Sequence, residues 1–295
     1  MTSSLAFSDC VDLETGIGEG PVWDARNASL WFVDIAASAL FRYTPETGAL
    51  IRHHMPDQVT SIGLTTDERL ILSLRTAVYL FTPATETLAL FATPDVGAPI
   101  NRLNDGKVGP DGSFWVGSMH VDRPAQPTGA LFRITKDGEI SQHSKGLRVS
   151  NGLAWSPDHR TMYHADSRGP FIRAYDYDPS TGAATDPRLF AQPDEAMGLP
   201  DGAAVDVDGN YWSAGVTAGC LNVFSPEGRL LRRIAVPMAA PTMPCFGGPD
   251  MRTLFVTGLT RTDGDRVISR GRLICCRVDT AGAPVARFGE PIFDI

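Results

Sequence analysis

The sequence predicts an all-β fold built from six similar units. Six glycines recur 43 to 50 residues apart, each at the entrance to a strand-like stretch: Gly20, Gly63, Gly106, Gly152, Gly202 and Gly247. That interval is typical of one four-stranded propeller blade. The chain contains 29 Gly and 22 Pro, and no stretch of ten or more residues shows a clean helical apolar period. We therefore predict a six-bladed β-propeller of four-stranded antiparallel blades.

Each unit begins with a predicted hairpin. In the first unit, residues 21–23 and 30–33 flank the turn at residues 24–27. Equivalent turns, rich in Asp, Asn, Pro and Gly, follow at residues 66–68, 109–112, 156–159, 206–209 and 248–250. These residue types close tight hairpins because they supply the backbone angles and local hydrogen bonds that such turns require.

A third predicted strand follows in five of the units, at residues 40–43, 78–81, 130–133, 172–175 and 221–224. Successive strands at these distances form a β-meander, whereas a two-sheet sandwich would not repeat at blade length. Because closed all-β folds reach this length as one unit, we expect a single domain over residues 1–295. Residues 5–11 and 291–295 are expected to pair within one blade and close the ring, unless both ends simply fray.

Composition excludes several classes of protein. The net charge is −8, with 34 acidic and 26 basic residues and no dense Lys/Arg run, so we expect no nucleic-acid partner. The first ten residues lack a signal-peptide pattern, and no run of eighteen apolar residues occurs, which favours a cytoplasmic protein without a membrane span. The five cysteines have no CxxC spacing and are expected to be reduced thiols.

The residues directly before the repeated glycines are the candidate functional residues. They are Glu19, Asp105, Asn151 and Asp201 in four units, with Asn104 directly before Asp105. The innermost strands of a propeller border one central channel. Side chains at the same position of successive units, directly before the repeated glycine, should therefore converge in that channel. Carboxylate and amide oxygens suit Ca²⁺, Mg²⁺ or Mn²⁺, and Zn²⁺ remains an alternative.

Two considerations qualify this metal hypothesis. Asp-Gly and Asn-Gly are also ordinary turn dipeptides, although these pairs fall outside the hairpin turns identified above. In the second and sixth units the equivalent residues are Ile62 and Phe246. We interpret them as an apolar wall on one side of the site.

Four segments carry a family resemblance. Residues 18–21, 104–107, 150–158 and 200–202 resemble the family of gluconolactonase, regucalcin (senescence marker protein) and the luciferin-regenerating enzyme. Residues 56–63 and 243–250 resemble its bacterial sugar-lactonase branch. The resemblance extends in order over essentially the whole chain.

The resemblance implies a site and a substrate class. One divalent ion (Ca²⁺, Zn²⁺, Mn²⁺, Mg²⁺ or Fe²⁺) would be held by Glu19, Asn151 and Asp201. A small-molecule sugar lactone would lie above it, bound by Arg102, Asn104 and Asp122. We expect the protein to act on this substrate as a monomer or a weak homo-oligomer.

The expected reaction is hydrolysis of a sugar (aldono) lactone to the free aldonic acid. The cation would polarise the lactone carbonyl, and Asp201 would act as general base and then acid, or as a metal ligand alone. Two alternatives remain: another ester or phosphoester hydrolase with the same metal site, and a non-catalytic Ca²⁺-binding propeller. A serine hydrolase is disfavoured because no GxSxG motif is present. His120 could border the channel mouth, and Asp34 and Asp166 are interpreted as structural acceptors for loop backbone.

Overall fold

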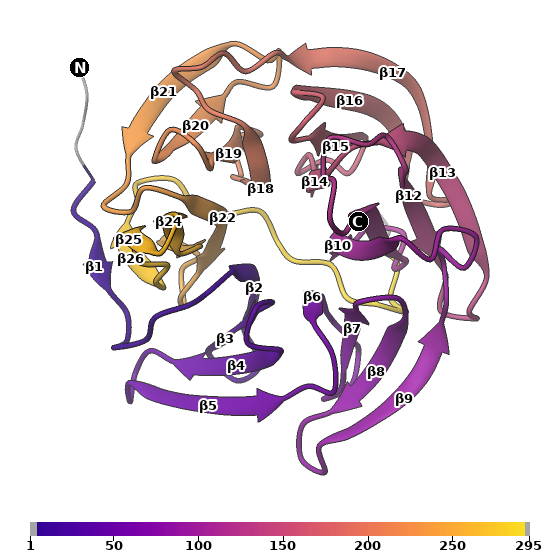
Figure 1. Ribbon diagram of the computed structural model, residues 1–295. Coiled ribbons are helices and arrows are strands. Elements are labelled where there is room, and N and C mark those ends of the chain that lie inside the picture. Colours follow the sequence, from indigo (N-terminus) through magenta and orange to yellow (C-terminus); the bar gives the residue numbers. More distant parts are fainter. Residues whose placement is uncertain (1–4, 293–295) are drawn as a thin grey trace.

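Six four-stranded antiparallel sheets surround a central axis in the computed structural model (Figure 1). The structure describes residues 5–292. Within this range every regular element is a strand, which confirms the predicted six-bladed β-propeller. No helix among the described residues has the length and apolarity required to cross a bilayer.

Blades 1 to 5 each consist of four strands that are consecutive in the chain and pair in chain order. Blades 1 and 2 comprise β2 (Gly18–Asp24), β3 (Ser29–Asp34), β4 (Ala39–Thr44), β5 (Ala49–His54), β6 (Val59–Leu64), β7 (Leu70–Leu74), β8 (Val78–Thr82) and β9 (Thr87–Ala92). Blade 3 comprises β10 (Asn101–Val108), β11 (Phe114–His120), β12 (Gly129–Ile134) and β13 (Ile140–Leu147). Blades 4 and 5 comprise β14 (Ser150–Trp155), β15 (Thr161–Asp166), β16 (Phe171–Asp178), β17 (Ala183–Ala191), β18 (Pro200–Val205), β19 (Tyr211–Gly215), β20 (Cys220–Phe224) and β21 (Leu230–Ala235).

Blade 6 closes the ring with a strand from each end of the chain. Its order is β22 (Pro241–Gly247), β23 (Thr253–Gly258), β26 (Ile274–Arg277) and β1 (Ser8–Asp9), and Ser8 pairs with Cys275. A separate hairpin, β24 (Arg261–Asp263) and β25 (Arg266–Ser269), is inserted between β23 and β26. The N-terminal segment therefore closes the ring as predicted, but the predicted partner was wrong. Residues 293–295 lie outside the described residues.

The C-terminal segment has a different role from the predicted strand. Residues 279–292 cross the centre of the ring, as the yellow trace in Figure 1 shows. The segment is fastened to blade 5 by the bond from Ala283 N to Val205 O (3.0 Å) and to blade 2 by that from Phe288 N to Leu64 O (2.7 Å). It therefore covers one end of the central channel.

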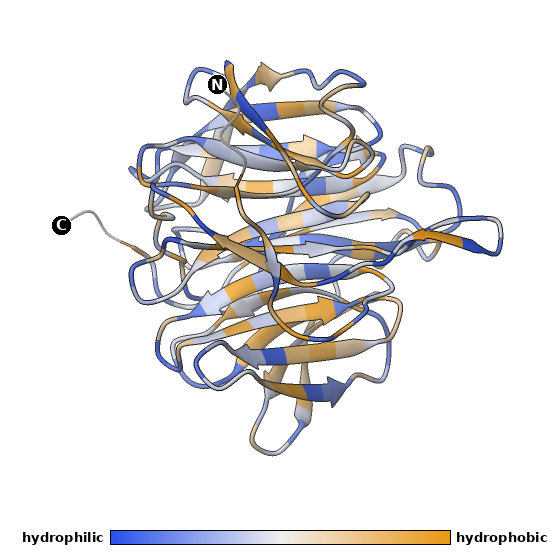
Figure 2. Ribbon diagram, turned by 90° about the vertical axis from the view of Figure 1, so that its left-hand side faces the viewer, coloured by the Kyte–Doolittle hydropathy of each residue, from blue (hydrophilic) through white to orange (hydrophobic). Residues whose placement is uncertain are grey.

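Large apolar side chains fill the space between the strands and between neighbouring blades. Hydrophobic and hydrophilic stretches alternate along the stacked strands in the side view (Figure 2). All five tryptophans are buried, and Trp23 of blade 1 stacks on Phe255 of blade 6 with ring centroids 5.9 Å apart. Trp115 and Trp155 similarly join blades 3 and 4. Aromatic side chains therefore pack neighbouring blades against one another.

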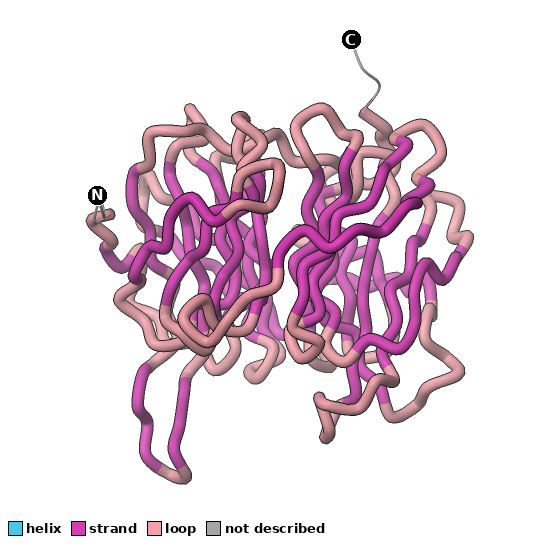
Figure 3. The backbone as a smooth tube through the Cα atoms, turned by 90° about the horizontal axis from the view of Figure 1, so that it is seen from above, coloured by secondary structure: helices cyan, strands magenta, loops and turns pink. Residues whose placement is uncertain are grey.

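The two ends of the ring differ. Viewed from above, the β24–β25 hairpin projects from the end opposite to the one from which the C-terminus leaves (Figure 3).

The five cysteines are Cys10, Cys220, Cys245, Cys275 and Cys276, and all are free thiols, as predicted.

Candidate functional site

A β-bulge occurs at the residue pair that the repeat singled out. The register of β2 on β3 shifts between Glu19 and Val22, and that of β14 on β15 shifts between Asn151 and Ala154. Corresponding shifts occur in β10 and β18. A bulge re-aims side chains that would otherwise point into a blade interface. Here it directs the polar residues toward the channel.

Glycine is required at the bulge of blade 4. Gly152 has φ of +65°, and a Cβ there would lie 2.5 Å from the hydroxyl of Tyr211 in blade 5. The Tyr211 hydroxyl also donates to Gly152 O (2.8 Å). Local backbone geometry and the close approach of the next blade therefore both exclude a side chain after Asn151.

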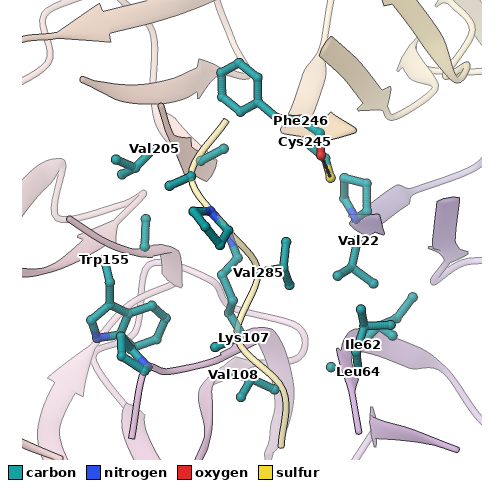
Figure 4. A pocket seen from close by; sticks show the side chains of 18 of the residues that line it. Val22, Ile62, Leu64, Lys107, Val108, Trp155, Val205, Cys245, Phe246 and Val285 are labelled. Atoms are coloured by element: carbon teal, nitrogen blue, oxygen red, sulfur yellow. Dashed lines mark hydrogen bonds between the residues drawn. The ribbon is translucent and has the colours of Figure 1, made fainter. Parts of the chain in front are cut away.

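The prediction of an apolar wall at the site was wrong. In β6 and β22 the irregularity lies earlier in the strand, at Thr60 and at Thr242. Consequently Ile62 and Phe246 lie beyond it, toward the end of the channel that the C-terminal segment covers. There they line an apolar cavity of about 100 Å³ together with Val285 of that segment (Figure 4).

The polar residues line a separate pocket of about 360 Å³. Glu19, Asn104, Asn151 and Asp201 all contribute to it, from blades 1, 3, 4 and 5. Thr242 of blade 6 also lines this pocket. In blades 1, 3, 4, 5 and 6 the first half of the innermost strand thus lines the polar pocket and the second half lines the apolar cavity.

Hydrogen bonds fix the orientation of Asn151. Its Nδ2 donates to Ser167 Oγ (2.7 Å), and its Oδ1 accepts from Asn104 Nδ2 (3.1 Å). An amide oxygen has two lone pairs, so Oδ1 keeps acceptor capacity toward the pocket. Asn104 Nδ2 also donates to Ser150 O (2.9 Å), which ties blade 3 to blade 4 at this level.

The two carboxylates of the pocket repel each other. Burial raises the pKa of Glu19 well above its ordinary value, and the neighbouring charges of Asp201 and Asp105 raise it further, while the N–H of Gly20 (3.0 Å) and Arg102 oppose the shift. Burial and the charge of Asp105 raise the pKa of Asp201 to about 8. Two acidic side chains thus lie close together where water is scarce.

Arg102 supplies positive charge beside these acids. Its Nη1 donates to Asn104 Oδ1 (2.7 Å) and to Leu103 O (2.9 Å). Burial lowers its pKa, and the charges of Glu19 and Asp201 partly restore it. The guanidinium is therefore held in place at the pocket wall, close to both carboxylates.

Asp105 is buried outside the pocket lining, and Lys107, two residues further along β10, lines the apolar cavity. Asp105 Oδ2 accepts from Leu153 N (3.3 Å), and its buried Oδ1 has no hydrogen-bond partner among the described residues. Lys107 Nζ donates to Ala203 O (2.6 Å) across the channel. These contacts join blades 3, 4 and 5 below the pocket.

Two further acids position the strands that enter the site. Asp34 accepts from Gly16 N (2.8 Å) and Ile17 N (2.9 Å), and Ile17 lies two residues before Glu19. Asp166 accepts from Arg148 N (2.9 Å) and Val149 N (3.0 Å), and Val149 lies two residues before Asn151. The expected structural role of both acids is confirmed.

Asp122 is exposed and does not line the pocket. His120 is partly exposed, and its Nδ1 accepts from Asp122 N (3.2 Å) and Arg123 N (3.1 Å), which shapes the loop. Pro124 is the residue of this loop that reaches the pocket. The pocket also includes polar residues that the repeat pattern missed because they lie on inter-strand loops or outside the glycine phase: Ser167, Arg168, Thr217, Thr242 and Arg261.

The donor set of the pocket fits a hard divalent cation. Among residues 5–292 no three His, Cys, Asp or Glu side chains are arranged to hold a metal ion, so the set depends on the amide of Asn151 in addition to Glu19 and Asp201. Two carboxylates and an amide oxygen are ligands that Ca²⁺ and Mg²⁺ accept. A cation there would offset the burial and the nearby negative charge that raise both carboxylate pKa values.

The sequence is similar to a known protein family and to two proteins named as lactonases. The model of the SMP-30/gluconolactonase/LRE-like region matches residues 17–260. A 6-deoxy-6-sulfogluconolactonase of Pseudomonas putida is 35% identical over 283 residues, covering 94% of each chain. A pentonolactonase of Haloferax volcanii is 33% identical over 299 residues, covering 98% of each.

A solved structure of a luciferin-regenerating enzyme superimposes with a TM-score of 0.90 at 27% identity, covering 96% of this chain and 99% of the other. The match in sequence and the match in structure thus extend over both the blades and the pocket. The chain belongs to the SMP-30/gluconolactonase/luciferin-regenerating enzyme family.

Proposed function

We propose that this protein is a sugar lactonase that opens an aldonolactone to the free acid. The observation that carries the proposal is the convergence of Glu19, Asn151 and Asp201 on one pocket, beside a buried arginine. Two relatives at 33% and 35% identity are lactonases by name, and both match over nearly their full length. Family membership and pocket chemistry therefore support the same reaction class.

Glu19, Asn151 and Asp201 would hold one divalent cation. When bound, such a cation supplies Lewis-acid polarisation of a carbonyl oxygen in contact with it. The residues around the pocket contribute the remaining functions. Arg102 presents a fixed fork of donors to carbonyl or hydroxyl oxygens, and the bonds to Asn104 and Leu103 hold it ready.

Asn104 would position substrate through its side-chain amide, which is fixed between blades 3 and 4. Asp201 would take a proton from the attacking water and return it to the ring oxygen as that oxygen leaves as a hydroxyl. General acid–base catalysis of this kind contributes about 10²- to 10⁴-fold. Asp122 would contact the sugar only if the loop at residues 121–128 moved toward the pocket.

The proposed role of Asp201 can be tested by substitution. Asp201→Asn is expected to lower kcat by about 10³-fold because the carboxylate that moves the proton is lost. Acid release from a panel of aldonolactones, followed with a pH indicator in the presence of added divalent cation, measures the effect. Circular dichroism confirms that the fold is retained.

Asp105→Asn is the matched control, since Asp105 occupies the same phase of blade 3 but does not line the pocket. Its kcat should fall by less than about tenfold. Equal loss in both variants would contradict the assignment of proton transfer to Asp201. Turnover of aryl esters or phosphoesters without turnover of any lactone would contradict the proposed substrate class.

A further inference from the structure

Two exposed arginines line the mouth of the pocket. Arg168 comes from the loop between β15 and β16 of blade 4, and Arg261 begins the β24–β25 hairpin of blade 6. Both side chains are exposed. Among residues 5–292 neither guanidinium forms an ion pair or a hydrogen bond. Some exposed arginines elsewhere, such as Arg188, Arg270 and Arg277, are paired with acids, whereas the exposed Arg252 bonds to Asp250 only through its backbone N–H.

The backbone at both arginines is nevertheless fixed. Asp166 Oδ1 accepts from Arg168 N (3.0 Å) and Gly169 N (3.0 Å). At the root of the hairpin, Thr260 N donates to Gly16 O (2.9 Å) and Thr260 Oγ1 donates to Thr15 O (2.7 Å). The two guanidinium groups therefore extend from fixed points on either side of blade 5, the blade that carries Asp201.

Basic side chains outnumber acidic side chains in the lining of the pocket. Its only acids among the described residues are Glu19 and Asp201, against Arg102, Arg168 and Arg261. A divalent cation between the two carboxylates would neutralise them and leave three positive charges. The protein as a whole carries a net charge of −8, so this concentration of positive charge is local to the pocket.

Arg102 and the outer pair occupy different depths. Arg102 is largely buried and interacts electrostatically with Glu19 and Asp201, which places it beside the reacting end of a substrate. Arg168 and Arg261 lie at the solvent side. A ligand whose carbonyl is held near Arg102 would therefore bring its opposite end to the outer pair.

We propose that Arg168 and Arg261 form a subsite for an anionic group at the end of the lactone remote from the carbonyl. The substrate class is then an aldonolactone that carries a terminal carboxylate, phosphate or sulfonate. The planar fork of a guanidinium matches the oxygens of any of these groups. This inference rests on the proposed function and narrows its substrate.

The test compares neutral and anionic lactones on the same enzyme. The wild type should show kcat/KM at least tenfold higher for an anionic lactone than for the neutral lactone of the same ring. Arg168→Gln and Arg261→Gln should each lower kcat/KM for the anionic lactone by about 10- to 100-fold, mainly through KM. Both variants should stay within about threefold of wild type on the neutral lactone.

Arg252→Gln is the matched control, because it removes one exposed positive charge outside the pocket. This substitution should leave kcat/KM unchanged for both the anionic and the neutral lactone. Lactones with a carboxylate, a phosphate or a sulfonate group are assayed separately. The lactone whose kcat/KM falls most in Arg168→Gln and Arg261→Gln identifies the anionic group that the subsite binds.

Good turnover of neutral lactones with no preference for any anionic one would overturn the subsite and leave the proposed function intact. Equal losses on neutral and anionic lactones in Arg168→Gln and Arg261→Gln would also overturn it. If the wild type hydrolyses no lactone of either kind, the proposed function fails, and the subsite fails with it.

Discussion

His164 is a fully buried ionisable residue behind β14, the strand of blade 4 that carries Asn151. Its Nε2 lies 2.8 Å from Ser150 Oγ, and its buried Nδ1 has no hydrogen-bond partner among the described residues. Burial lowers the pKa of His164 to about 3, with smaller effects from the charges of His143 and Arg173. The imidazole is therefore neutral in the folded protein near pH 7.

This residue predicts a specific loss of stability in acid. The unfolded chain takes up a proton on this histidine near pH 6.5, whereas the folded protein does so only near pH 3. The stabilisation is complete above pH 6.5 and is lost progressively as the pH falls, by about 2 kcal/mol between pH 7.5 and pH 5. Urea unfolding of the metal-free protein at several pH values measures it.

His164→Gln is the control, since glutamine stays neutral at all these pH values. The raised pKa of Asp201 acts in the opposite direction, because it adds stability as the pH falls through 8. That contribution is present in both proteins and cancels in their difference. An identical pH dependence of wild type and His164→Gln would show that His164 is not the responsible group.

At the scale of elements, ring closure depends on the short strand β1. Only Ser8 and Asp9 form it, but Leu5 and Phe7 pack on the core between blades 5 and 6, and Tyr43 donates from its hydroxyl to Cys10 O (2.8 Å). Without this strand, β26 would become an exposed edge. The N-terminal segment therefore covers an edge as well as joining the ends of the chain.

Deletion of residues 1–9 is expected to lower the free energy of unfolding by about 2–4 kcal/mol, from lost apolar burial and lost backbone hydrogen bonds. Thermal and urea unfolding measure the loss. Arg272→Gln removes the exposed ion pair with Asp9 (2.8 Å) and the bond that Arg272 Nη2 donates to Pro237 O, and it should cost less than about 1 kcal/mol. If both changes cost the same, closure by β1 contributes nothing beyond that ion pair.

At the scale of the whole molecule, the proposed cation would link four blades. Glu19, Asn151 and Asp201 come from blades 1, 4 and 5, and the bonds of Asn104 add blade 3. The complete set forms only when the ring is closed, so a cation should bind the folded protein and not the unfolded chain. At 100 times its Kd, a ligand of this kind stabilises by about 2.7 kcal/mol.

Removing metal with a chelator is therefore expected to lower the Tm, and adding back Ca²⁺, Mg²⁺, Mn²⁺ or Zn²⁺ in turn should restore it for the ion that binds. Differential scanning fluorimetry measures the shift. Glu19→Gln, which keeps the size of the side chain but removes its charge, should abolish the response to metal. A full response in Glu19→Gln would exclude Glu19 from the site.

Much of this protein follows from local sequence. The spacing of the glycines predicts six blades because each blade repeats the same strand lengths and turns. Glu19, Asn151 and Asp201 can be identified because a bulge with its glycine is a local backbone signal, and equal phase in the innermost strands brings the side chains to one channel. Asn104 and Arg102 belong to the same strand type and reach the same pocket.

Other features were decided by tertiary structure alone. Ile62 and Phe246 share the glycine period but not the position of the bulge, so strand register, set by pairing with β7 and β23, moves them to the apolar cavity. Pairing of β1 with β26, the path of residues 279–292 across the channel, and the approach of Arg168 and Arg261 to one mouth depend on contacts between segments distant in sequence. Local patterns carry no information on such contacts, because they form only when the closed ring brings the blades together.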